Sequence, residues 1–131
     1  MTALGRPMTR IRRLLSLFAA APLFAVSPAL AHAILITSTP GTDQTIAARP
    51  AAIVLRYNSR VDQHRSLVTL AGPAQDKPLP LSIEEGTPAN ELHVAPPTAM
   101  APGSYRLRWQ VLATDGHITR GEVPFVIAPA H

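Results

Sequence analysis

The stretch Tyr105-Arg106-Leu107-Arg108-Trp109-Gln110-Val111 decides the fold class of this chain. Large apolar side chains occupy every second position, and polar or charged side chains occupy the positions between them. Because successive side chains of an extended strand point to opposite faces, this alternation predicts a β-strand with one buried face and one solvated face. Such a strand needs several partners before its buried face is covered.

Weaker versions of the same pattern occur on both sides of this stretch. Further strands are expected at Ile53–Asn58, Val123–Ile127, Ala33–Thr37, Leu67–Leu70, Leu79–Ile83 and Glu91–Val94. Glycine and proline turn signals separate them, as at Pro40-Gly41 and Pro102-Gly103. The spacing predicts an all-β domain, a small Greek-key β-barrel or immunoglobulin-like sandwich of about seven strands. Pro124 cannot donate to a ladder, so its position is expected at an edge or a bulge.

Residues 1–31 are expected to be a cleaved secretory signal peptide, which leaves 32–131 as the mature domain. Arg10, Arg12 and Arg13 precede an apolar run that ends near Val26, and Ala29-Leu30-Ala31 is a small-x-small cleavage signature. The apolar run is shorter than the roughly 20 residues that span a bilayer, so we expect removal rather than a retained membrane anchor. Export would place the mature protein outside the cytoplasm.

The excess positive charge of the chain lies in this leader. Four of the twelve basic residues lie in it, whereas all eight acidic residues follow it. The mature chain therefore has a formal net charge of zero, which removes any argument for nucleic-acid or anionic-membrane binding. There is no cysteine, so disulfides and thiolate metal sites are excluded.

Two features of the mature chain carry candidate metal chemistry. After cleavage His32 would be the first residue, and its free α-amine and imidazole Nδ1 could together chelate one ion. The second feature is Thr114-Asp115-Gly116-His117. In an extended backbone, Asp115 and His117 would point to one face and could meet the same ion. By itself this second motif is a weak signal, because an Asp-Gly turn followed by a histidine is usually an ordinary hairpin with a surface histidine.

Taken together, these features resemble the CopC family of periplasmic copper-resistance proteins. The resemblance rests on the initial His32-Ala33, the segment Pro102 to Trp109, the Asp115-Gly116-His117 motif and the alternating end from Gly121 to Ile127. It implies a small Greek-key β-barrel, a periplasmic location and a role in copper resistance and homeostasis. It also implies that one Cu(II) ion is bound by His32, Asp115 and His117.

The donor set suits that metal, because Cu(II) prefers a tetragonal plane of nitrogen and oxygen ligands. The resemblance further implies an inner-membrane CopD-type copper transporter as recipient, and we expect a monomer that does not insert into the membrane. Ser59 stands where many relatives have a glutamate near the copper, and Met100 alone cannot build a thioether Cu(I) site. Among the other histidines, His64 is the best candidate for an auxiliary contact, whereas His93 and His131 are expected to be surface or structural.

Two other function classes remain open from the sequence. A copper ion held by an amino-terminal histidine also serves oxygen-activating monooxygenases, although this chain is short for a polysaccharide-binding face and Asp115 would fill the position at which oxygen binds. Alternatively, the chain could be a metal-free immunoglobulin-like interaction domain. We expect a binding protein and not an enzyme.

Overall fold

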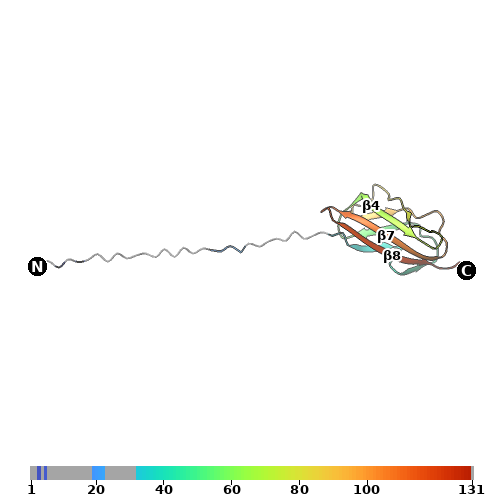
Figure 1. Ribbon diagram of the computed structural model, residues 1–131, viewed down its shortest axis with the longest axis horizontal. Helices are drawn as coiled ribbons and strands as arrows, with labels where there is room; N and C mark the ends of the chain where they lie inside the picture. Colours follow the sequence, from blue (N-terminus) through green and yellow to red (C-terminus); the bar gives the residue numbers. More distant parts are fainter. Residues whose placement is uncertain (1–2, 4, 6–18, 23–31, 131) are drawn as a thin grey trace.

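The computed structural model describes residues 3, 5, 19–22 and 32–130. Residues 32–130 form a β-sandwich, and no helix occurs among the described residues, so none of the described segments is a helix able to cross a membrane (Figure 1). The strands are β1 (Leu35–Thr39), β2 (Gln44–Ile46), β3 (Ile53–Tyr57), β4 (Val61–Ala71), β5 (Leu79–Pro80), β6 (Glu91–Val94), β7 (Gly103–Ala113) and β8 (Ile118–Ile127). The all-β prediction is confirmed. Most of the predicted leader, and His131, lie outside the described residues, so the domain boundary at residue 32 stays a prediction.

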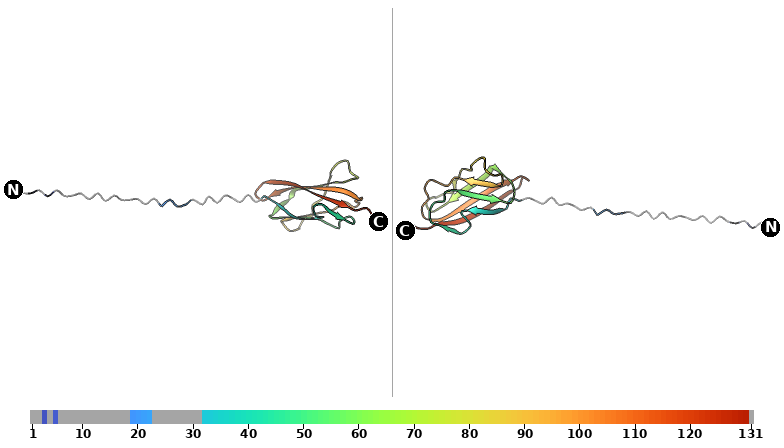
Figure 2. Two further views of the ribbon diagram at one scale, coloured as in Figure 1. Left: turned by 90° about the horizontal axis from the view of Figure 1, so that it is seen from below. Right: turned by 180° about the vertical axis from the view of Figure 1, so that it is seen from behind.

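The strands form two sheets that face each other (Figure 2). One sheet has the order β1-β3-β6, and the other has the order β2-β8-β7-β4-β5. All neighbours are antiparallel except β2, which runs parallel to β8. The long β7–β8 hairpin forms the centre of the larger sheet, with paired residues from Gly103↔Ile127 to Leu112↔Ile118.

The core lies between the sheets and follows the alternation in the sequence. In β7 the buried side chains are Tyr105, Leu107, Trp109, Val111 and Ala113, and the residues between them are exposed or half-buried. Tyr57, Phe125 and Leu107 are among the largest fully buried side chains. Burial of each such side chain contributes roughly 1.5–3 kcal/mol, so this interface is what holds a cysteine-free domain together.

The predicted strand bounds differ from the structure in several strands; β8, for example, begins at Ile118 instead of Val123. The strand β2 was missed because three residues are too few to show alternation. The predicted strand Leu79–Ile83 is shorter, because Leu79 and Pro80 pair with β4 while Ile83 bridges to Val94 in the other sheet. A segment that changes sheets cannot continue one ladder.

The strand β4 is longer than predicted and begins at Val61 instead of Leu67. Its pairing with β7 is irregular between Asp62 and Leu67. The Asp62 carboxylate accepts the backbone N–H groups of His64 and Arg65, both at 3.1 Å. The bulge therefore replaces ladder bonds with side-chain bonds, which explains why this part of the strand reads as a polar loop in sequence.

Pro124 lies inside β8, which has neighbours on both sides, and the pairing of β8 with β7 runs through it without a bulge. The expectation of a bulge is therefore wrong, whereas the side of β8 away from β7 has no ladder partner at Pro124, as at a sheet edge. The Pro124 carbonyl accepts the Asp43 N–H at 2.7 Å, so the backbone at this position faces the β2 side. Pairing with β2 begins only at Phe125, and the missing proline N–H thus costs the β7 ladder nothing.

Candidate metal centre

The turn between β7 and β8 places Asp115 and His117 together. Ala113 and His117 close the turn through an Ala113 N–H to His117 carbonyl bond of 2.9 Å. Gly116 has a φ of 87°, a conformation that side chains rarely adopt. The backbone is thus a tight turn here, and the expectation of an extended backbone is wrong, although the two side chains still meet.

Asp115 makes two contacts with His117. One carboxylate oxygen accepts the backbone N–H of His117 at 2.9 Å, and the other lies 3.1 Å from its Nδ1. The backbone hydrogen bond, followed by the side-chain bond and the charges of His117 and His32, lowers the pKa of Asp115. The carboxylate therefore stays ionised to lower pH than an ordinary aspartate, which suits a cation ligand.

His32 joins this pair from the other end of the domain sequence. Its imidazole lies 5.1 Å from that of His117 between ring centroids, with the rings nearly perpendicular at 78°. The β7–β8 turn lies at the end of the sandwich where the chain enters it (Figure 1). The structure therefore brings the three predicted residues into one exposed cluster.

The cluster as it stands does not enclose an ion. In residues 32–130 and the short described segments before them, no three His, Asp or Glu side chains are disposed to hold a metal together. The α-nitrogen of His32 is bonded to Ala31 in the full chain, so one predicted donor is absent from it. His32 and His117 are both exposed, and rotation of their side chains is therefore unobstructed by a surrounding core.

The remaining described histidines do not join the cluster. His64 lies 3.7 Å from Glu85, with both side chains about 80% exposed. His93 is held by Glu91 at 2.7 Å on β6. Ser59 is partly buried, and its hydroxyl has no hydrogen-bond partner among the described residues. Neither His64 nor Ser59 has a contact that supports an auxiliary role.

Trp109 lies in the core of the same hairpin. It is 7% exposed and meets Tyr57 edge to face, with ring centroids 5.3 Å apart. A buried indole N–H usually finds an acceptor, but no described residue supplies one here. A Cβ at Gly121 would lie 2.4 Å from the ring. Trp109 is thus a packing residue that requires glycine on the neighbouring strand.

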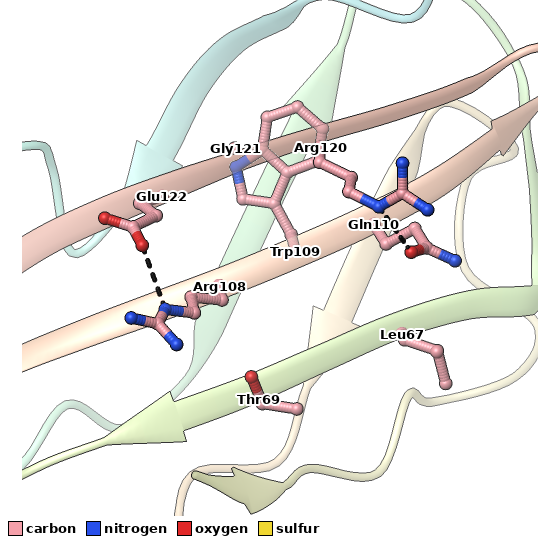
Figure 3. Close-up of a pocket in the computed structure, with 8 residues that line it drawn as sticks. All are labelled: Leu67, Thr69, Arg108, Trp109, Gln110, Arg120, Gly121 and Glu122. Atoms are coloured by element: carbon pink, nitrogen blue, oxygen red, sulfur yellow. Dashed lines mark hydrogen bonds and ion pairs between the residues drawn. The ribbon is translucent and has the colours of Figure 1, made fainter.

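A groove of about 410 Å³ lies on the outer face of β4, β7 and β8 (Figure 3). Four of its polar side chains are paired with one another. Arg108 Nε lies 2.9 Å from Glu122, and Arg120 Nε donates to Gln110 at 2.8 Å. None of the three candidate metal ligands lines it, so it is separate from the candidate metal centre.

One neighbour of the cluster was not singled out from sequence. The side-chain oxygen of Asn58 accepts the N–H of Ile34 at 2.8 Å, two residues after His32. An asparagine at the end of a strand gives no sequence signal for such a contact, because its partner lies 24 residues away.

These observations define a small two-sheet β-sandwich protein with a His–Asp–His cluster exposed at one end. Residues 35–128 match the family model described as the CopC domain. The chain therefore belongs to the CopC family, as the sequence motifs predicted.

Individual relatives agree with this assignment. The chain is 31% identical to protein YobA of Escherichia coli K12, across 78% of this chain and 84% of that protein. It is 29% identical to copper resistance protein C of Xanthomonas campestris pv. juglandis, across 79% and 85% of the two chains. Both matches cover nearly the whole described domain.

Solved structures show the same fold. The crystal structure of CopC from Methylosinus trichosporium OB3b superposes with a TM-score of 0.67 at 26% identity, across 76% of this chain and 97% of that one. PcoC of Escherichia coli, described as a methionine-rich copper resistance protein, gives a TM-score of 0.62 at 25% identity, across 74% and 99%. The expected sandwich architecture is thereby confirmed.

Proposed function

We propose that this protein is an exported Cu(II)-binding protein that carries or buffers copper and passes it to a membrane partner. The observation that carries the proposal is the meeting of His32 with Asp115 and His117 at one exposed end of the sandwich. His32 is more than 80 positions from Asp115 and His117 in the chain, so only the fold brings it to them. The choice of copper as the metal is supported by relatives that are named copper resistance proteins.

The donor set fits Cu(II) after cleavage before His32. The α-amine and ring of His32 give two nitrogens, His117 gives a third, and Asp115 gives an oxygen. Such a set favours a tetragonal Cu(II) complex, and copper exceeds zinc in affinity for it. With neutral nitrogens and one carboxylate, the complex keeps a single positive charge. We propose one Cu(II) per chain.

A Cu(I) site of thioethers is not part of this proposal. Met100 is the one methionine after residue 31, and it packs against the hydrophobic core. Soft sulfur ligands are what Cu(I) selects. The protein therefore differs in this respect from PcoC, which is described as methionine rich.

The location and the recipient complete the proposal. The leader at residues 1–31 would deliver the protein to the periplasm, and family resemblance points to an inner-membrane CopD-type transporter as the recipient. We propose a monomer, since the copper ligands all come from one chain.

Copper titration of protein beginning at His32 tests the proposal, with a version that carries one glycine before His32 as control. The added residue turns the α-amine of His32 into an amide and removes one nitrogen donor. We expect much weaker Cu(II) binding and a changed electron paramagnetic resonance spectrum for the extended protein. Equal affinities and identical spectra for the two proteins would disprove the amino-terminal chelate.

A copper monooxygenase is the second candidate, because an amino-terminal histidine holds copper in both cases. Asp115 is an ionised carboxylate beside His117 and would occupy an equatorial position. Ascorbate-driven peroxide production by the copper-loaded protein separates the two, and we expect no production above that of a metal-free control.

A further inference from the structure

The residues next to His32 are held far more tightly than its exposed side chain implies. Ala33 is fully buried in the core between the sheets. Ile34 is itself 60% exposed, so its side chain does not anchor the segment 32–34. The backbone of Ile34 is nevertheless held at both of its polar groups, and both bonds go to Asn58.

The two bonds form a reciprocal pair. The Ile34 N–H donates to Oδ1 of Asn58 at 2.8 Å, and the Asn58 backbone N–H donates to the Ile34 carbonyl at 3.0 Å. In an antiparallel ladder two residues exchange two backbone bonds in this way. Here the asparagine side chain replaces one backbone carbonyl, just before the ladder between β1 and β3 begins at Leu35↔Tyr57.

The consequence is that the chain is held two residues after His32. Only one buried residue separates it from the clamped Ile34, so the remaining freedom lies in the His32 backbone torsions and its own side chain. A chelate gains affinity when its donors are held in place before the metal arrives, because less conformational entropy is then lost on binding.

We infer that Asn58 is a positioning residue for the copper chelate, acting through the Ile34 backbone and not by contact with the metal. This inference rests on the proposed function for its copper part. Residues that orient metal ligands typically account for a 10–100-fold difference in metal affinity. We expect a loss of that size when the side-chain acceptor is removed.

The test uses protein beginning at His32 and three variants. Asn58→Ala removes the acceptor, and Asn58→Asp keeps an oxygen that can accept the Ile34 N–H. Asn90→Ala is the matched control, because the Asn90 side chain donates to the Tyr57 carbonyl at 3.3 Å, beside Asn58, without touching Ile34. Amide hydrogen exchange at Ile34 in metal-free protein reports the clamp, and chelator competition with electron paramagnetic resonance reports the copper.

We expect Asn58→Ala to lose protection at Ile34, to bind Cu(II) about 10–100-fold more weakly and to give a broadened or mixed spectrum. Asn58→Asp should recover the protection and the parent spectrum, and Asn90→Ala should change neither. Parent-like affinity and spectrum for Asn58→Ala would reduce Asn58 to a structural residue and overturn the inference.

Failure of the proposed function gives a different pattern. A parent protein without tight Cu(II) binding disproves the copper proposal by itself. In that case, lost protection at Ile34 in metal-free Asn58→Ala still supports the inference that Asn58 positions the segment 32–34. Retained protection at Ile34 overturns that inference.

Discussion

At the scale of single residues, Asp115 links backbone geometry to site chemistry. Its carboxylate closes the turn by accepting the His117 N–H and also faces the His117 ring. The same hydrogen bonds lower its pKa, so the group that shapes the turn is also kept in the state that binds a cation. A substitution here must therefore be chosen to separate the two roles.

Asp115→Asn and His117→Ala should both weaken Cu(II) binding. Asparagine still accepts the His117 N–H, so the turn remains while the negative charge is lost; alanine at 117 removes one nitrogen donor. Since even the residues behind metal ligands account for 10–100-fold in affinity, we expect losses of at least about tenfold. Chelator competition measures them, and circular dichroism checks that the fold is retained.

His93→Ala is the control for these two variants. It also removes an imidazole beside a carboxylate, but that pair lies on β6 and is 31% and 22% exposed. We expect its Cu(II) affinity to equal that of the parent. If His117→Ala bound Cu(II) as tightly as His93→Ala does, the β7–β8 turn would not be part of the copper site.

At the scale of elements, the β7–β8 hairpin connects the core to the site. Trp109 and Gly121 are cross-strand partners, and the indole lies in the space that any other residue at 121 would fill. Four residues further along β7, the strand ends at Ala113 and the site turn begins. Packing at this pair therefore fixes the strand that presents Asp115 and His117.

Gly121→Ala should destabilise the domain by about 1–3 kcal/mol, as overpacking of a filled core does. The added Cβ would lie 2.4 Å and 2.7 Å from two atoms of the indole ring. Urea unfolding followed by the fluorescence of Trp109, the single tryptophan, measures the change.

Gly41→Ala is the matched control, because its added Cβ would have its nearest contact at 3.5 Å, to a Gln44 side-chain oxygen. We expect a change of less than about 0.5 kcal/mol, typical of surface substitutions. Equal unfolding midpoints for the two variants would contradict the close approach of Trp109 to Gly121.

The elements also show what sequence can and cannot predict here. Alternation identified β3, β6 and most of β7, because their inner faces are continuous rows of apolar residues. It missed the first part of β4, where Asp62 bonds replace ladder bonds. The three candidate ligands were predicted from motif and resemblance, and their role in metal binding stays a prediction. The clamp on Ile34 was not predicted, because a contact between Ile34 and Asn58 leaves no local pattern.

At the scale of the whole molecule, processed protein should bind one Cu(II) ion and have no strong Cu(I) site. One candidate cluster is present among the described residues, and the side chain of Met100 is packed against the core. Titration with competing chelators for each oxidation state measures both. A second tight Cu(II) equivalent, or Cu(I) binding tighter than Cu(II) binding, would contradict a single nitrogen–oxygen site.

The pH dependence of copper binding joins the amino terminus to the fold. An α-amine has a reference pKa of about 7.7–8.0 and must lose its proton to bind metal. For protein beginning at His32, Cu(II) affinity should therefore fall about tenfold per pH unit as the pH drops from about 7.5 to 6.5.

Asp115 should not contribute to this loss. Its pKa is lowered by the His117 N–H, and a lowered carboxyl pKa means that protonation begins only below the ordinary range. Protein with a glycine before His32 lacks the positioned amine, so its weaker affinity should be nearly flat from about pH 7.5 to 7.0. Chelator competition at closely spaced pH values measures both curves. Equal slopes in that range would show that no α-amine proton is displaced and that copper is held by side chains alone.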